Sequence, residues 1–294
     1  MEIIQKIKTN GLIFDGALGT MLIKAGVGNQ KISDYWNLEK PGLIKDIHRS
    51  YIKAGADIVT TNTFGASRLK LKKVKLDMHL EEINQNAVRV AKNVNGKNNY
   101  VAGNIGPIGE MLSPNGPISF EEAQDNFSEQ AEVLSKSGID IYIVETMYDI
   151  NEALAAIQGI RLVSNLPIIS TLTFDYKNKS FATVMGNQAI DSFKQLINIG
   201  ANIIGANCSL GSNTMVLLSQ LINEQFKGLT IIQPNAGLPD VVGHNLVYPE
   251  TIEEFTENII TIKKNGINIV GGCCGTTPEY IAAINNALNA NTNN

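Results

Sequence analysis

Apolar, β-branched runs alternate with segments of helical periodicity along the whole chain, and this alternation restricts the fold more than any other feature of the sequence. The eight expected strands are residues 12–14, 57–60, 100–102, 139–144, 168–172, 202–206, 230–232 and 267–270. The eight expected helices are residues 43–54, 80–94, 120–137, 151–163, 189–199, 215–226, 251–265 and 279–288. Strands that alternate with helices form parallel sheets, and eight such units in 294 residues are typical of a closed (β/α)8 TIM barrel. We therefore predict an α/β protein with a single barrel, whose active site lies at the carboxyl ends of the strands.

No linker-like stretch divides the chain, so we expect one domain that spans residues 1–290. The last residues, 291–294, are polar and are expected to form a disordered tail. An open, doubly wound sheet is the alternative fold. It is disfavoured because no Gly-x-Gly-x-x-Gly pattern follows the first expected strand.

The composition argues against several classes of function. The formal net charge is −4 and no long basic run occurs, which argues against a nucleic-acid partner. No apolar stretch approaches the roughly 18 residues that a membrane-spanning helix needs. The amino terminus is too polar for a signal peptide, and an odd number of cysteines fits a reducing compartment better than a disulfide framework. We therefore expect a cytoplasmic protein.

Two adjacent cysteines, Cys273 and Cys274, follow the last expected strand, with glycines on both sides. Neighbouring side chains on a regular strand point to opposite faces, so these two thiols can meet only where the backbone leaves strand geometry. The flanking glycines permit such a turn. Cys208 follows the sixth expected strand, two strand positions away in a ring of eight. We therefore expect the three sulfur atoms to converge at one rim of the barrel.

Three convergent cysteines suit zinc, which is tetrahedral and bonds sulfur at about 2.3 Å. Three protein ligands and one open position are typical of a catalytic zinc site. The three histidines, His48, His79 and His244, do not follow expected strands, so a histidine ligand is not expected. An all-sulfur ligand set activates water poorly but holds a substrate thiol as the reactive thiolate, which favours alkyl transfer. The alternatives are three buried core cysteines or a disulfide between the adjacent pair.

Carboxylates and glycine amides also follow expected strands. Asp15 and Gly16 follow the first strand and offer an anion for an ammonium group and N–H donors for a carboxylate, as a zwitterionic amino acid requires. An ordinary turn is the alternative for this pair. Glu145 ends an apolar strand, where a carboxylate is costly to bury without a partner; a structural ion pair or a helix cap is its alternative role. Four asparagines stand at the same rim, where each can instead stabilise a turn: Asn62, Asn104, Asn207 and Asn235.

The segments at these strand ends resemble the homocysteine S-methyltransferase family. They are residues 15–20, 61–66, 104–107, 145–146, 207–211, 234–237 and 271–278, and the likeness extends over nearly the whole chain. Within the family, the sequence is most similar to the amino-terminal homocysteine-binding module of cobalamin-dependent methionine synthases. The resemblance implies that the barrel is a zinc-dependent homocysteine-binding domain. It also implies that this domain methylates homocysteine to methionine.

The resemblance also implies roles for individual residues. The zinc ligands, which are also the catalytic residues, would be Cys208, Cys273 and Cys274. The groups that hold the amino acid end of homocysteine would be Asp15, the amides of Gly16 and Ala17, and Glu145. Asn235 would lie close to the metal when the substrate is absent.

The methyl donor can be inferred from the relatives. The likeness to the cobalamin-dependent branch implies methylcobalamin on a corrinoid protein, either a separate chain or a further module of this one. Betaine-dependent and S-methylmethionine-dependent relatives consist of one barrel, so an onium donor is the alternative. A protein that binds zinc or a thiol without catalysis is an alternative of another class, and it predicts a closed site and no turnover.

Overall fold

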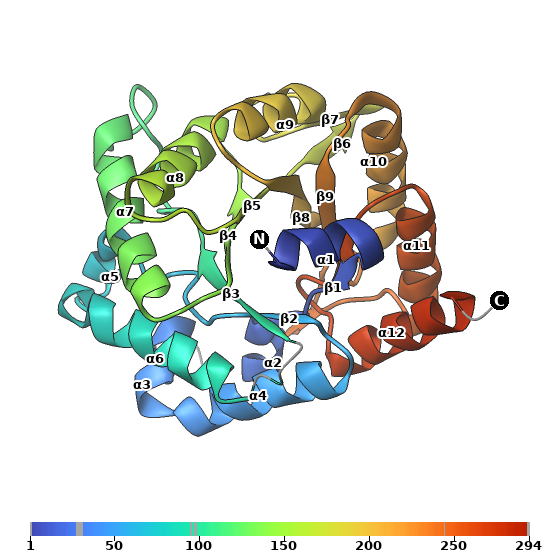
Figure 1. Ribbon diagram of the computed structural model, residues 1–294, viewed down its shortest axis with the longest axis horizontal. Helices are drawn as coiled ribbons and strands as arrows, with labels where there is room; N and C mark the ends of the chain where they lie inside the picture. The colour runs from blue at the N-terminus through green and yellow to red at the C-terminus, as the bar shows by residue number, and fades with distance from the viewer. Residues whose placement is uncertain (1, 28–31, 95, 97–98, 244, 293–294) are drawn as a thin grey trace.

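The computed structural model describes residues 2–27, 32–94, 96, 99–243 and 245–292. Its strands of the main sheet are β1 (Leu12–Ile13), β2 (Ile58–Thr60), β3 (Tyr100–Ile105), β4 (Ile141–Met147), β5 (Ile168–Leu172), β8 (Ile203–Gly211), β9 (Leu229–Asn235) and β12 (Ile269–Val270). They are all parallel and lie in the order β1-β12-β9-β8-β5-β4-β3-β2. A parallel bridge between Phe14 and Ile58 joins the two outer strands. The sheet is thus closed, which confirms the predicted barrel, and the open-sheet alternative is wrong (Figure 1).

A ring of helices surrounds the barrel at the predicted places (Figure 1). They are α4 (Pro41–Lys53), α6 (Leu80–Lys92), α7 (Phe120–Lys136), α8 (Ile150–Val163), α9 (Ala189–Asn198), α10 (Ser212–Gln225), α11 (Ile252–Lys264) and α12 (Pro278–Thr292). Capping boxes fix the starts of α7 and α11, where Ser119 and Thr251 each pair with a glutamate three residues later. Helix α12 continues to Thr292, two residues into the segment expected to be disordered, and residues 293–294 lie outside the described residues.

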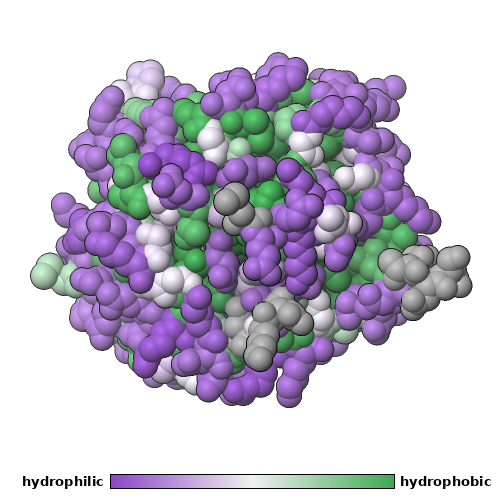
Figure 2. Space-filling model, viewed as in Figure 1, coloured by the Kyte–Doolittle hydropathy of each residue, from purple (hydrophilic) through white to green (hydrophobic). Residues whose placement is uncertain are grey.

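Helix α1 (Glu2–Asn10) was not predicted from the sequence. It lies across the barrel axis, near the centre of the view in Figure 1. Ile3 and Ile7 are buried against the apolar residues inside the barrel, among them Leu12 and Ile58 near the strand starts. The helix therefore covers the amino-terminal end of the barrel, and its outer face is mostly hydrophilic in Figure 2. The active site must then open at the other end.

The remaining elements lie in loops that follow the strands. The β1 loop contains α2 (Leu18–Lys24), η1 (Ser33–Tyr35) and α3 (Trp36–Glu39), and the β2 loop contains α5 (Arg68–Lys73) and η2 (Asp77–His79). Two antiparallel hairpins, β6 (Asp175–Lys177) with β7 (Ser180–Ala182) and β10 (Asp240–Val242) with β11 (Asn245–Val247), follow β5 and β9. Among the described residues, no helix combines the length and the apolar character needed to cross a bilayer.

Candidate active site

A layer of polar side chains lies inside the barrel at the carboxyl ends of its strands. Side chains alternate between the inside and the outside of a barrel wall. The inward-facing positions are apolar at Ile58, Ala102, Ile143, Ile169 and Ile231, which pack together in one cluster. Two residues further along the same strands, the inward positions become polar. These positions, with Asn207 on β8, form what we call the polar layer: Thr60, Asn104, Glu145, Thr171, Asn207 and Gln233.

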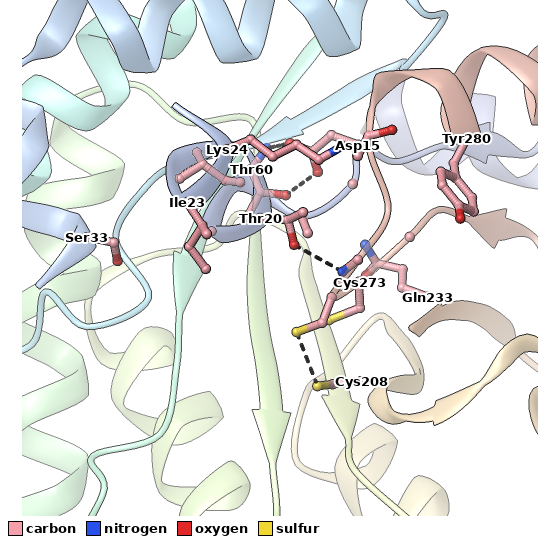
Figure 3. Close-up of a pocket in the computed structure, with 18 of the residues that line it drawn as sticks. Asp15, Thr20, Ile23, Lys24, Ser33, Thr60, Cys208, Gln233, Cys273 and Tyr280 are labelled. Atoms are coloured by element: carbon pink, nitrogen blue, oxygen red, sulfur yellow. Dashed lines mark hydrogen bonds between the residues drawn. The ribbon is translucent and has the colours of Figure 1, made fainter. Parts of the chain in front are cut away.

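The three cysteines converge beside this layer, as the sequence predicts. Their sulfur atoms all lie within 4.8 Å of one another, and the Sγ atoms of Cys208 and Cys274 are 3.9 Å apart (Figure 3). All three are free thiols that line a cavity, so neither a disulfide nor a closed apolar core describes them. Tetrahedral bonds of about 2.3 Å place neighbouring sulfurs roughly 3.8 Å apart, so this spacing fits a zinc ion.

The backbone at Cys208 explains how its sulfur reaches the site. Asn207 faces the barrel interior, so Cys208 would point outward if β8 were regular. Instead, Cys208 and Ser209 adopt the left-handed conformation, with φ of 60° and 55°, and the register with β9 shifts between Asn207 and Gly211. This bulge turns the consecutive side chains of Asn207 and Cys208 toward the same end of the barrel. Non-glycine residues adopt this conformation rarely, and such strain concentrates at functional sites.

Backbone hydrogen bonds hold the loop with the adjacent cysteines against the end of β9. The Cys273 N–H donates to the Pro234 carbonyl over 2.7 Å, and the Ala236 N–H donates to the Cys274 carbonyl over 2.9 Å. Gly272 lets this loop fold tightly, because a Cβ atom there would lie 2.2 Å from the hydroxyl oxygen of Thr276. The loop geometry therefore depends on the absence of a side chain beside Cys273.

We expect Gly272→Ala to lower zinc occupancy and to destabilise the protein by about 1–3 kcal/mol, because the new methyl group forces the cysteine loop to move. Elemental analysis and thermal unfolding measure the two effects. Gly19→Ala is the matched control, since Gly19 lies in α2 with no atom within 4 Å of the added Cβ, and it should retain full zinc. Equal zinc content in both variants would contradict this role of Gly272.

The thiols interact strongly with one another. Hydrogen bonds from the thiols of Cys208 and Cys273 hold the pKa of Cys274 well below its usual value. Contacts with Cys208 and Cys274 raise the pKa of Cys273 well above its usual value, because a second thiolate would lie beside the first. One thiol of the cluster therefore ionises readily, and complete ionisation requires a compensating cation.

Asn235 and the histidines bear on the fourth position of such a site. Asn235 is buried at the end of β9, between the two residues whose backbones bond to the cysteine loop, and its Oδ1 has no hydrogen-bond partner among the described residues. Its proximity to a metal stays a prediction. His48 is buried in α4 and His79 lies in η2, so neither belongs to the cysteine cluster, and His244 lies outside the described residues.

Asp15 lies at the cavity and is tied to the neighbouring strand rather than to a turn of its own. Its Oδ2 accepts from the Thr60 N–H over 2.7 Å, and its Oδ1 accepts from the Thr60 hydroxyl over 2.8 Å (Figure 3). The side chain is buried, with 2% of its surface exposed. Thr60 thereby positions this carboxylate, a role that its place inside a strand did not suggest.

Glu145 is held by two asparagines of the polar layer. Its Oε1 accepts from Asn104 Nδ2 over 2.6 Å, and its Oε2 accepts from Asn207 Nδ2 over 3.1 Å. Asn207 also accepts from the Thr146 N–H and from the Thr171 hydroxyl, and its Nδ2 faces Cys273 Sγ at 3.8 Å. Asn207 therefore links the carboxylate to the cysteine cluster, and these contacts go beyond the turn-stabilising role that is the alternative for a rim asparagine.

The two carboxylates lack a cation. Burial raises the pKa of Asp15 to about 7 and that of Glu145 to about 7, against hydrogen bonds that act in the opposite direction. The charge of Asp15 adds to the increase at Glu145, so the two groups share one electrostatic environment. Neither forms an ion pair within the described part of the chain, which leaves the structural ion pair proposed for Glu145 unsupported. A bound ammonium group would supply the missing charge.

The glycine amides after β1 are only partly available. The Ala17 N–H donates to the Thr276 carbonyl over 3.2 Å, so it is not free to bind a substrate carboxylate in this conformation. The Gly16 N–H has no partner among the described groups. The sequence could not distinguish these two amides, because the Thr276 carbonyl comes from the other end of the chain.

A cavity of about 1210 Å³ connects these groups with the surface. Its wall includes Asp15, Glu145 and the three cysteines, and it extends outward between α2 and the end of β11. Gln233 and Tyr248 also line it, and neither was singled out from the sequence. The ring of Tyr248 packs on Gly275, where an added Cβ would lie 2.3 Å from it, and the Tyr248 hydroxyl contacts Cys274. Parity along β9 could have identified Gln233, whereas nothing in the sequence marks Tyr248.

Comparison with known proteins identifies a family whose model matches most of this chain. The model of the homocysteine S-methyltransferase family matches residues 12–288 of this chain. The methionine synthase of Mycobacterium leprae (strain TN) is 27% identical over 301 aligned residues, which cover 96% of this chain and 25% of that protein. The methionine synthase of Mycobacterium tuberculosis matches with the same figures. The chain therefore spans about a quarter of the length of these relatives.

Solved structures share the fold. The homocysteine methyltransferase MmuM of Escherichia coli, in its metallated form, matches with a TM-score of 0.80 at 21% identity, covering 95% of this chain and 97% of that one. A methyltransferase from Methanosarcina mazei matches with a TM-score of 0.64 at 9% identity, covering 99% of this chain and 98% of that one. At these identities the likeness concerns the barrel architecture.

Proposed function

Because the chain belongs to the homocysteine S-methyltransferase family, we propose that it transfers a methyl group to the sulfur of homocysteine and so forms methionine. The observation that carries the proposal is a single cavity with three convergent thiols at one place and two buried carboxylates without a cation at another. Homocysteine carries one group for each of these, a thiol and an α-ammonium. Relatives named as methionine synthases and as a homocysteine methyltransferase support the same reaction.

The donor set fits zinc, with Cys208, Cys273 and Cys274 as the ligands. The fit rests on three sulfur donors at tetrahedral spacing and on a thiol cluster that needs a cation to ionise fully. Bound zinc would keep the homocysteine thiol ionised near neutral pH, and a thiolate is the nucleophile that a methyl transfer needs.

The side chains of the chain position the substrate around that sulfur. Asp15 and Glu145 bind the α-ammonium group, and the Gly16 amide donates to the carboxylate; Ala17 can join it only if its bond to Thr276 opens. Substrate sulfur forms a bond to the methyl carbon while the bond from that carbon to the donor breaks. Anchoring both ends of a small substrate converts this displacement into an oriented reaction between neighbours.

For the methyl donor we propose a methylcorrinoid bound to a corrinoid protein or module, with an onium compound as the alternative. The wide cavity leaves room for a donor to approach the cysteine cluster from the surface. Parallel assays of homocysteine with methylcobalamin, S-methylmethionine, betaine and methyltetrahydrofolate, each with and without a corrinoid protein, test this. Methionine formation from one donor identifies it. No turnover with any donor would instead support a zinc- or thiol-binding protein without catalysis.

X-ray absorption at the zinc edge gives a test that does not depend on the donor. We expect three sulfurs and one lighter atom around zinc in the substrate-free protein, with Asn235 as the candidate for the lighter ligand. With homocysteine we expect four sulfurs and the release of about one proton per site, because only the thiolate binds zinc. A sulfur count that stays at three with saturating homocysteine would exclude substrate coordination and overturn the proposed acceptor.

A further inference from the structure

Asn104 occupies a rigid place in the polar layer, beside Glu145 and on the wall of the cavity. Its backbone N–H donates to the Thr61 hydroxyl oxygen over 2.9 Å, and its carbonyl accepts from the Thr63 hydroxyl over 2.7 Å. These two threonines are themselves hydrogen-bonded to each other and lie on the loop after β2. The Asn104 backbone is therefore fixed from the neighbouring strand, and its side chain projects from a defined point.

The orientation of the Asn104 amide follows from its partner. The amide presents its NH2 group to Glu145 Oε1, 2.6 Å away. This is the orientation that an ionised carboxylate requires, because a carboxylate can only accept hydrogen bonds. The amide oxygen then points away from Glu145. Asn104 is 5% exposed, and its Oδ1 atom is buried. This atom has no hydrogen-bond partner among the described residues. Buried polar atoms are rarely left without a partner, and those that are need an explanation.

We propose that Asn104 Oδ1 accepts a hydrogen bond from the α-ammonium group of the amino acid substrate, as the third acceptor beside Asp15 and Glu145. The inference rests on the proposed function and deepens it. A primary ammonium group has three N–H bonds, and the three acceptors come from three places on the barrel wall: after β1, on β3 and on β4. Asn104 would thus make the site specific for a primary amine.

Other unpartnered amide oxygens fit this role less well. Gln233 Oε1 and Asn235 Oδ1 are also buried without partners in the described structure, but neither is hydrogen-bonded to a carboxylate of the site. Asn207, the other asparagine that contacts Glu145, already uses its oxygen to accept from Thr146 and Thr171. Among the asparagines that hold Glu145, only Asn104 therefore combines this contact with a free acceptor.

The test compares three thiols in calorimetric titrations of the zinc-loaded protein. Homocysteine has the primary amine, N-methylhomocysteine lacks one N–H, and 4-mercaptobutanoate lacks the amine. In Asn104→Ala we expect the Kd of homocysteine to rise about 10- to 100-fold, as for loss of a hydrogen bond to a charged group. The Kd of 4-mercaptobutanoate should change less than about twofold. The Kd of N-methylhomocysteine should rise less than about threefold in the same variant, because the methyl group of this ligand fills the space that the Asn104 amide leaves.

Each contrary result has a separate meaning. Equal losses for both amines would show that Asn104 acts only by holding Glu145, and would overturn the proposal. Equal losses for all three thiols, or none, would overturn it too. If the unmodified protein bound none of the thiols, the proposed function itself would fail. Asn104→Ser serves as a second variant, and Asn126→Ala is the matched control, because this buried asparagine contacts Leu69 on the outer helices and should leave all three affinities unchanged.

Discussion

Replacing any one of Cys208, Cys273 and Cys274 with alanine is expected to abolish methyl transfer and to release zinc, while the barrel stays folded. Zinc bound by four ligands in small peptides has a binding free energy of about 10–16 kcal/mol, so each ligand contributes on the order of 3 kcal/mol, or about 100-fold in affinity. With two sulfurs left, the site also loses the arrangement that holds a substrate thiol beside the donor. The fold should survive because the cysteines lie at the rim, outside the large apolar core.

Elemental analysis, an assay of methionine formation and circular dichroism measure these three outcomes. Ser209→Ala is the matched control, because Ser209 shares the left-handed bulge with Cys208 but its hydroxyl bonds to the Phe174 carbonyl and not to the cluster. It should retain zinc and activity. A cysteine variant that retained both would place the metal site elsewhere, and one that unfolded would show that the cluster is needed for the fold.

The sequence predicted the barrel and the cysteine cluster for a physical reason. Parallel strands end at a common rim, so residues that follow different strands meet regardless of their separation in the chain. Cys208 and Cys273 are far apart in sequence yet were expected together on this basis, and their sulfurs do converge. The same reasoning placed Asp15 and Glu145 at the cavity.

What the sequence did not reveal is how consecutive residues at the rim share the space. Asn207 and Cys208 both face the site only because of the bulge in β8. Cysteine and threonine seldom adopt a positive φ, so nothing in the sequence indicated that Cys208 and Thr146 do. Helix α1 is short, and its role in covering the barrel depends on packing with residues far along the chain. Counting inward positions from Ile143 would have identified Glu145 and its neighbours as a layer, whereas the hairpin that precedes Tyr248 follows no periodic pattern.

The carboxylate pair gives the second large expected effect, in which stability and substrate affinity change in opposite directions. Burial raises the pKa of Asp15 from 3.8 to about 7 and that of Glu145 from 4.5 to about 7. A carboxyl group with a raised pKa in the folded state contributes stability that is complete below the unfolded pKa and is lost as pH rises toward about 7. At about pH 8, each ionised group therefore costs the metal-free, substrate-free protein roughly 3–4 kcal/mol.

Asp15→Asn should therefore raise the free energy of unfolding at about pH 8 by up to roughly 3–4 kcal/mol and change it little near pH 4. The same variant should weaken homocysteine binding about 10- to 100-fold, because a charge-assisted hydrogen bond to the ammonium group is lost. Glu145→Gln should show the same two effects with a smaller gain in stability. Both oxygens of Glu145 accept from amide NH2 groups, so the NH2 group of glutamine would face the NH2 group of Asn104 or Asn207, and two donors cannot form a hydrogen bond.

Denaturant unfolding at the two pH values and calorimetric titration with homocysteine measure these effects, and Glu152→Gln separates them. Burial also raises the pKa of Glu152 to about 7, but this residue lies in α8 and accepts from the Ile108 N–H, away from the cysteine cluster. It should show the pH-dependent gain in stability without any change in homocysteine affinity. If Asp15→Asn were stabilised like Glu152→Gln but bound homocysteine as tightly as the unmodified protein, the carboxylate would be buried for a reason other than the ammonium group. An unfolding free energy at about pH 8 that did not rise in either variant would show instead that these groups are already neutral or compensated in the folded protein.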